Sequence, residues 1–162
     1  MRRPVRLKLK TPVRLTPDTT ERREPTSHVN TIERFVGTYE GSGSWHDAAA
    51  KSGTYKIRQT NVTTADGFEV SFKHHFDDGT VVDARFAMTW VAPNIFRVDL
   101  AGTALGHGYV SDDYCHYYFK AGDRFVEASY RASGEGLRVN GSSSTNAEGH
   151  FTAWAETLTP AR

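Results

Sequence analysis

The sequence of 162 residues has little cysteine and methionine and no long apolar run. Cys115 is its single cysteine, which excludes an internal disulfide and favours a reducing compartment. No apolar segment approaches the roughly 20 residues that a membrane-spanning helix requires, and the basic N-terminal stretch lacks the apolar core of a secretory signal. We therefore expect a cytoplasmic protein that is not embedded in a membrane.

Sequence spacings typical of metal and nucleotide sites are also absent. H-x-H, C-x-x-C and H-E-x-x-H do not occur, and the glycines at 41–43 and 106–108 are not followed by the helix that a phosphate site uses. Cys115 and His116 are neighbours, but neighbouring residues on a strand project to opposite faces and do not form a catalytic pair. We predict no metal site and no cofactor on these grounds.

Charge is distributed unevenly along the chain. Residues 1–27 carry eight Lys or Arg and three Asp or Glu, a charge of +5, whereas the rest of the chain carries −4. We interpret residues 1–28 as a basic, flexible tail and residues 29–162 as one domain. Two alternatives for the N-terminal stretch are an arm that binds a polyanion and a strand at 5–10 that docks on a sheet edge. Because the domain is net acidic, we expect no nucleic-acid partner.

Apolar and polar residues alternate along the chain from residue 38 onward, with turn residues between the alternating segments. Together with many aromatics, this pattern favours β structure. Before it, Asn30 and Glu33 resemble a capping box and Gly37 stands where a helix would end, so we expect a short helix at 31–36. We predict an all-β fold, an antiparallel up-and-down β-barrel of about 8–10 strands with a short N-terminal helix. The expected strands are 38–46, 53–62, 67–76, 80–91, 95–101, 104–111, 114–120, 124–132, 136–142 and 149–158.

The segment from Phe68 to Leu100 specifies its own register. A three-residue loop at 77–79 sets apolar residues of the two strands against each other, whereas a two-residue turn would oppose Phe72 to Arg85 and mix apolar with charged residues on each face. A second loop at 92–94 continues the same apolar face onto a third strand. The predicted pairs are Phe72 with Ala84, Val70 with Phe86, Phe68 with Met88, Trp90 with Phe96, Met88 with Val98 and Phe86 with Leu100.

The residues that follow the expected helix resemble the start of the calycin superfamily, which covers lipocalins, fatty-acid-binding proteins and nitrobindin-like barrels. Gly37 and Tyr39 match its G-x-W signature, with Tyr in place of Trp, and Gly41 and Gly43 resemble the nitrobindin-type G-x-W-x-G-x-G. The resemblance covers the chain from about residue 30 and implies a barrel with a ligand inside. Nitrobindin-type barrels hold haem through a histidine in the C-terminal part. Only His150 lies there, and its surroundings match no motif. The resemblance therefore suggests haem as a cofactor, but the residues do not support it.

His74 is the first candidate for chemistry, because it lies on the apolar face beside Val82. It is either a core residue with satisfied hydrogen bonds or a neutral imidazole in a pocket, where burial lowers its pKa and makes it useful as a base or ligand. His75 points to the opposite face, so the two histidines cannot chelate one metal.

Histidines and tyrosines also gather at residues 104–119, where a two-residue turn at 112–113 gives two faces. A four-residue loop at 101–104 sets Leu100 against Leu105 and sends the His/Tyr face inward, whereas a loop one residue different sends the glycines and Cys115 inward. We favour the first arrangement. In either arrangement the turn at 112–113 pairs Tyr109 with His116 and His107 with Tyr118.

The next turn, near Gly122, sets His116 against Glu127. A histidine beside a carboxylate is the geometry of an oriented general base, and it is also common as a pair on solvated surfaces. Both interpretations stay open from the sequence.

We predict that the lumen of the barrel binds a small apolar or aromatic ligand, with a homodimer as a further partner. The alternative is a small β-barrel enzyme of cyclase or isomerase type that acts on a hydrophobic substrate in the same cavity, so the sequence leaves open whether the protein is an enzyme. The predicted ligand-binding residues are His74, Trp90, His107, Tyr109, His116, Tyr118, Glu127 and Tyr39.

Overall fold

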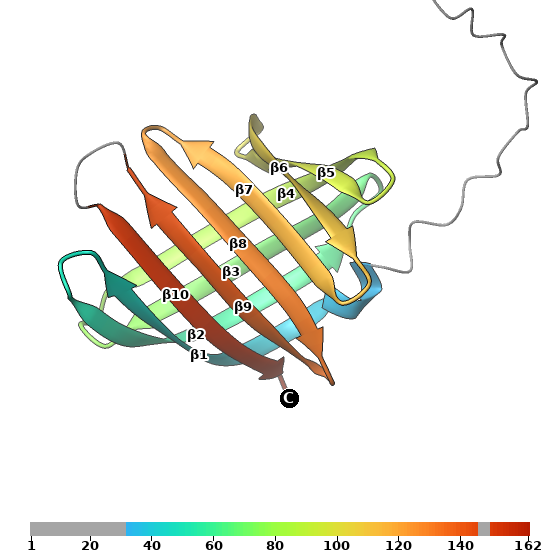
Figure 1. Cartoon of the computed structure of the whole chain (residues 1–162). Coiled ribbons are helices and arrows are strands. Elements are labelled where there is room, and N and C mark those ends of the chain that lie inside the picture. Colours follow the sequence, from blue (N-terminus) through green and yellow to red (C-terminus); the bar gives the residue numbers. More distant parts are fainter. Residues whose placement is uncertain (1–31, 146–149) are drawn as a thin grey trace, which may run out of the picture.

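A computed structural model describes residues 32–145 and 150–162, so the predicted tail and the Asn30 cap lie outside the described residues. Ten antiparallel strands follow one another in space as in sequence, and β1 pairs with β10 to close the barrel (Figure 1). The predicted up-and-down β-barrel is confirmed. Its strands are β1 (Gly37–Asp47), β2 (Ser52–Thr63), β3 (Gly67–Phe76), β4 (Val81–Ala92), β5 (Ile95–Leu100), β6 (Thr103–Ser111), β7 (Tyr114–Ala121), β8 (Arg124–Ser133), β9 (Gly136–Ser144) and β10 (Phe151–Pro160).

The register predicted for β3 and β4 is confirmed. Phe72 pairs with Ala84, Val70 with Phe86 and Phe68 with Met88. The Phe76 N–H donates to the Thr80 carbonyl at 2.9 Å, and Gly79 has a φ of 85°, the left-handed conformation that a three-residue loop needs. In the next pairing Trp90 lies opposite Phe96 and Met88 opposite Val98, as predicted, but the ladder begins at Ala87 and Asp99, so the predicted pair of Phe86 with Leu100 does not form.

The prediction that the His/Tyr face of β6 points inward is wrong, and a β-bulge is the reason. A tight turn at Ala101–Gly102 pairs Leu100 with Thr103, but one extra residue in β6 then shifts the register, so that Val98 pairs with Gly106. Because Val98 is fully buried, the glycines face the lumen and His107 faces solvent. A Cβ atom on Gly108 would lie 2.4 Å from the Phe96 ring, so no larger residue fits at that inward position.

The pairing of β7 with β8 differs from the prediction by two residues. The turn is at Gly122–Asp123 rather than one residue earlier, because Ala121 pairs with Arg124. His116 therefore lies opposite Ser129, and its Nδ1 is 2.9 Å from the Ser129 Oγ. Glu127 lies opposite Tyr118, so the predicted histidine–carboxylate pair does not form.

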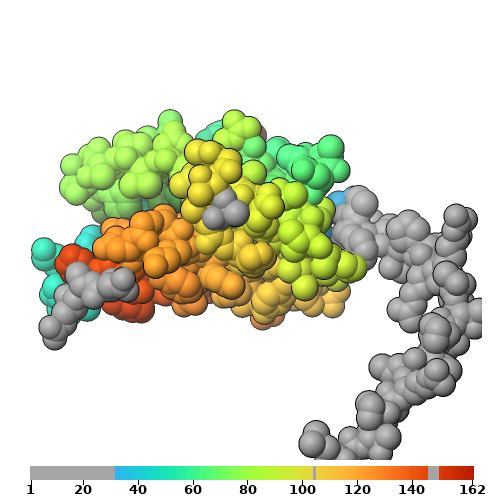
Figure 2. Space-filling model, turned by 90° about the horizontal axis from the view of Figure 1, so that it is seen from above, coloured from blue at the N-terminus to red at the C-terminus, as the bar shows by residue number. Residues whose placement is uncertain are grey.

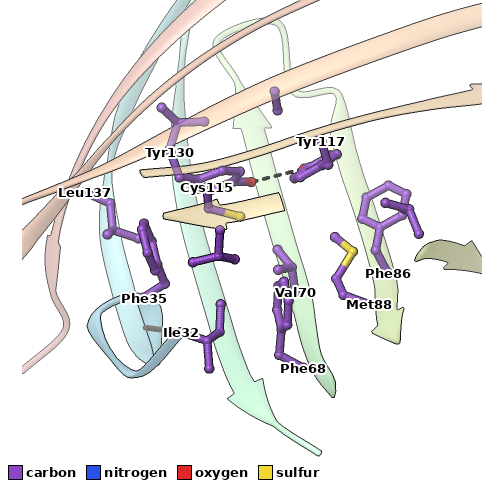
Figure 3. Close-up of a cluster of buried hydrophobic side chains, with 14 of the residues drawn as sticks. Ile32, Phe35, Phe68, Val70, Phe86, Met88, Cys115, Tyr117, Tyr130 and Leu137 are labelled. Carbon is purple, nitrogen blue, oxygen red and sulfur yellow. Dashed lines mark hydrogen bonds between the residues drawn. The ribbon is translucent and has the colours of Figure 1, made fainter. Parts of the chain in front are cut away.

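One end of the lumen is closed by a 3-10 turn, η1 (Glu33–Phe35), where we expected a short helix at 31–36. Ile32 and Phe35 are each 3% exposed and pack against inward residues of the barrel such as Phe68 and Val70 (Figure 3). Asn61 fixes η1 from the wall, because its Nδ2 donates to the Phe35 carbonyl at 2.7 Å. No described helical segment is long and apolar enough to cross a membrane.

Candidate ligand-binding site

The other end of the lumen contains a cavity of about 390 Å³. This volume lies in the range of about 300–1,000 Å³ that small-molecule sites occupy. The cavity reaches the turns that join β3 to β4 and β7 to β8, at the end of the barrel away from η1. Most of its wall is aromatic, with Trp45, Tyr55, Phe72, Phe86, Phe119 and Trp154 among the lining residues.

Three of these rings lie over glycines of the neighbouring strand. Tyr55 pairs with Gly43, Trp45 with Gly53 and Trp154 with Gly141. A Cβ atom on Gly43 would lie 2.3 Å from the Tyr55 ring, and one on Gly141 would lie 2.3 Å from the Trp154 ring. The glycines therefore let the large rings lie flat along the wall, which leaves space in the centre of the lumen.

A cluster of three polar side chains, Tyr55, His74 and Glu156, lies at this aromatic wall. The Tyr55 hydroxyl donates to Glu156 Oε1 at 2.7 Å, and His74 Nε2 is 3.5 Å from the same oxygen. The Glu156 side chain is 3% exposed and the His74 side chain 15% exposed. The imidazole is held between two rings, with its centroid 4.5 Å from that of Phe72 and 4.6 Å from that of Tyr55.

Burial shifts the pKa values of this group in opposite directions. It raises the pKa of the Glu156 carboxyl to about 7, although the hydrogen bond from Tyr55 acts in the other direction. It lowers the pKa of the His74 imidazole to about 4 and raises that of the Tyr55 hydroxyl far above its usual range. Near neutral pH His74 is therefore uncharged, and Glu156 is the group of the three that gains or loses a proton.

A pair of tyrosine hydroxyls lies deeper in the lumen. The Tyr117 and Tyr130 hydroxyls are 3.2 Å apart and buried, as Figure 3 shows. Burial is the main cause that raises the pKa of both, and the charge of Glu156 raises it further. These tyrosines stay neutral and supply hydrogen-bonding groups without charge.

The cavity also opens through the side of the barrel. Strand β5 is short, so its pairing with β4 starts only at Ala87, and the pairing of β6 with β7 ends at Phe119. Among the described strands, the first half of β4 therefore pairs with β3 alone. Figure 2 shows this part of β4 (green) facing the β7–β8 hairpin (orange) beyond the β5–β6 hairpin (yellow). Val82 lines the cavity here and is 41% exposed.

Of the residues predicted to bind ligand, His74 alone lines this cavity, and its inward orientation is confirmed. Trp90 packs against Phe68 and Phe96 near the closed end, with ring centroids 5.5 Å and 5.9 Å away. Tyr39 is buried in the core, where its hydroxyl donates to the Val36 carbonyl at 3.2 Å. Both therefore serve packing of the barrel.

The other predicted residues lie on the outer surface of β6, β7 and β8. Tyr109 is 44% exposed and Tyr118 is 43% exposed, and His107 and Glu127 are also exposed. His116 is half-buried among outer side chains, with its ring 5.8 Å from that of Tyr109. The bulge in β6 placed all five outside, which corrects the expectation that they enclose the ligand.

Sequence reasoning missed Glu156, although its signal is present. Along β10 the residues Thr152, Trp154, Glu156 and Leu158 share the inward face, so an acid stands between two large apolar residues. A charged residue on the apolar face of an alternating strand is unusual, because burial of an unpaired charge is costly. The hydrogen-bond partner of Glu156, Tyr55, lines the cavity from β2.

The described residues contain no group of three or more His, Cys, Asp or Glu that could hold a metal ion. His150, the histidine that the resemblance to nitrobindin-type barrels suggested as a haem ligand, is exposed at the rim and does not line the cavity. His74, the imidazole inside, directs Nε2 toward Glu156. These residues do not fit a haem held by a C-terminal histidine.

No known protein family matches the chain, and no curated protein matches it in sequence. Solved structures do match. The S-type phycobiliprotein lyase CPES from Guillardia theta superposes with a TM-score of 0.65 at 14% identity, over 81% of this chain and 90% of that one. Rv2717c from M. tuberculosis gives a TM-score of 0.64 at 13% identity, over 84% and 98%. A mutant of the fluorescent protein UnaG gives 0.50 at 11% identity, over 81% and 99%. The chain therefore shares the β-barrel fold of these proteins.

Proposed function

We propose that this barrel binds a small apolar or aromatic molecule in its lumen, and that it does so in the cytoplasm, where the free thiol of Cys115 stays reduced. The observation that carries the proposal is the cavity of about 390 Å³, whose wall is mostly aromatic and includes Tyr55 and His74, the two side chains that contact the buried Glu156 carboxyl. Apolar walls supply affinity through burial, and a few fixed polar groups orient the ligand.

The loose packing at the open end of the lumen supports the proposal. Inward residues at the open end leave space, because rings lie flat over glycines instead of meeting across the lumen. Domain interiors normally contain few voids larger than a water molecule. A cavity of this size, bounded by rings and open to solvent at Val82, is therefore a feature that a ligand would use.

The test uses the full chain and the fluorescent neutral probe N-phenyl-1-naphthylamine. Two matched variants on β4 separate lumen from surface: Ala84 lines the cavity, whereas Ala87 is exposed on the outer face. Ala84→Trp fills the cavity and is expected to weaken probe binding by about tenfold or more. Ala87→Trp is expected to bind the probe as the unaltered chain does. Equal binding by both variants, or no binding by the unaltered chain, would refute the proposal.

A second candidate is an enzyme of isomerase or cyclase type that uses the same cavity. Its support is Glu156, a buried carboxyl whose pKa of about 7 lets it hold or release a proton near neutral pH, 3.5 Å from His74. Glu156→Gln decides between the two, because glutamine keeps an acceptor for Tyr55 and cannot transfer a proton. A bound molecule that the unaltered chain converts and the variant leaves unchanged would identify an enzyme.

A further inference from the structure

At the mouth of the lumen a second hollow, of about 280 Å³, borders the aromatic cavity. The two share Arg124, Ser143 and Thr152 in their walls. A ligand that fills the inner cavity therefore meets this outer hollow at its exposed end.

The outer hollow is basic. Lys51 and Arg124 line it, and neither side chain forms an ion pair with any residue that the structure describes. Its acidic residue, Asp47, is engaged in the β1–β2 turn, because Oδ1 accepts the N–H groups of Ala49 at 2.9 Å and Lys51 at 2.8 Å. Among the described residues, two cations without an ion-pair partner thus stand at the rim.

The inner cavity has the opposite polarity. The Glu156 carboxyl, 3% exposed, lies behind the lining residues Tyr55 and His74, and an anion brought to this part of the wall would lose its hydration and be repelled by the ionised form. At the rim, an anion would keep part of its hydration and gain the attraction of Lys51 and Arg124. The charges along the barrel axis therefore favour one orientation of a charged ligand.

We infer that the ligand is an amphipathic anion whose apolar ring system fills the lumen and whose anionic group stays at the rim beside Lys51 and Arg124. This inference rests on the proposed function and adds a charge and an orientation to it. A cationic ligand would instead place its charge inside, beside Glu156, with the rim cations repelling it as it enters.

The test compares two probes that share one skeleton, the neutral N-phenyl-1-naphthylamine and the anionic 8-anilinonaphthalene-1-sulfonate. We expect the full chain to bind the sulfonate about fivefold to tenfold more tightly than the neutral probe at low salt, as two partly exposed cations would give. Lys51→Gln, at the cation that lines the outer hollow alone, should weaken this preference and keep the affinity for the neutral probe, and the double variant Lys51→Gln/Arg124→Gln should lose the preference. The preference of the unaltered chain should also weaken as NaCl is added.

A matched control removes the same charge elsewhere. Lys56 and Arg138 lie exposed on the outer face of β2 and β9, and Lys56→Gln/Arg138→Gln should keep the preference for the sulfonate. Equal affinity for the two probes, or a preference that survives loss of the rim cations, would overturn the inference while leaving the proposed function intact. Failure of the neutral probe to bind at all would overturn both.

Discussion

The two ends of the lumen are built by the same strands and differ in what closes them. On β3, Phe68 and Val70 face the closed end, where the remaining void is about 10 Å³, whereas Phe72 and His74 line a cavity of about 390 Å³. Both pairs are apolar or aromatic, so strand composition does not explain the difference. At the closed end η1 inserts Ile32 and Phe35 between the walls. At the open end no described residue fills the lumen, and the short β5–β6 hairpin leaves the side open.

The polar groups of the two ends differ in the same way. At the closed end they are amides, with Gln59 Nε2 donating to Asn61 Oδ1 at 2.9 Å and Asn61 in turn bonded to η1. At the open end they ionise, as Glu156 and His74 do. Amides hold a structure at every pH, whereas ionisable groups beside a cavity offer a ligand a proton or a charge. The closed end therefore holds the fold, and the open end carries the chemistry.

The largest effect expected is a loss of stability at the closed end. Phe35→Ala should lower the free energy of unfolding by about 3–5 kcal/mol, because it opens a void among fully packed side chains. Phe72→Ala should cost only about 1–2 kcal/mol, because that half-buried ring already borders a cavity. Urea unfolding at pH 7 measures both. Equal losses would mean that the open end is packed as tightly as the closed one.

The next effect concerns the buried carboxyl. The pKa of Glu156 is about 7 in the folded chain against an ordinary 4.5, so its contribution to stability is complete below pH 4.5 and is lost as the pH rises through 7. Glu156→Gln removes this loss, and at pH 8 the variant should be more stable than the unaltered chain by about 3 kcal/mol, with the two nearly equal at pH 4.

Urea unfolding at the two pH values gives the difference, and Glu135→Gln, which removes an exposed carboxyl from the β8–β9 turn, is the control. A Glu156→Gln chain that is less stable than the unaltered one at pH 8 would contradict the prediction. It would mean that Tyr55 and its neighbours stabilise the ionised carboxylate more than burial destabilises it.

The barrel was predictable from the sequence where alternation fixes both strands of a pair. Between β3 and β4, only one loop length keeps Phe72 against Ala84 and Lys73 against Asp83, so the register followed from the residues. The inward orientation of His74 followed with it. A local pattern was sufficient because both faces of the pair carry clear side-chain classes.

The orientation of β6 could not be predicted in the same way. The residues on each face of β6 are compatible with either the lumen or the solvent. One extra residue at Leu105 is enough to exchange the inward and the outward face. Only the space available beside Phe96 selects Gly108 for the inside, and that space depends on strands distant in sequence. Glu156 was missed for a different reason, since its partners Tyr55 and His74 come from strands at the other end of the chain.

The smallest effect tests this corrected orientation. Tyr118 and Phe119 are neighbours on β7, with Tyr118 stacked on Phe125 at the surface, 5.8 Å between centroids, and Phe119 buried in the cavity wall. Tyr118→Ala should change the free energy of unfolding by less than about 1 kcal/mol and leave the affinity for N-phenyl-1-naphthylamine unchanged. Phe119→Ala should cost about 3 kcal/mol and alter probe binding. If Tyr118→Ala weakened probe binding as Phe119→Ala does, the outer aromatic face would take part in binding. The division between a binding lumen and a non-binding exterior would then fail.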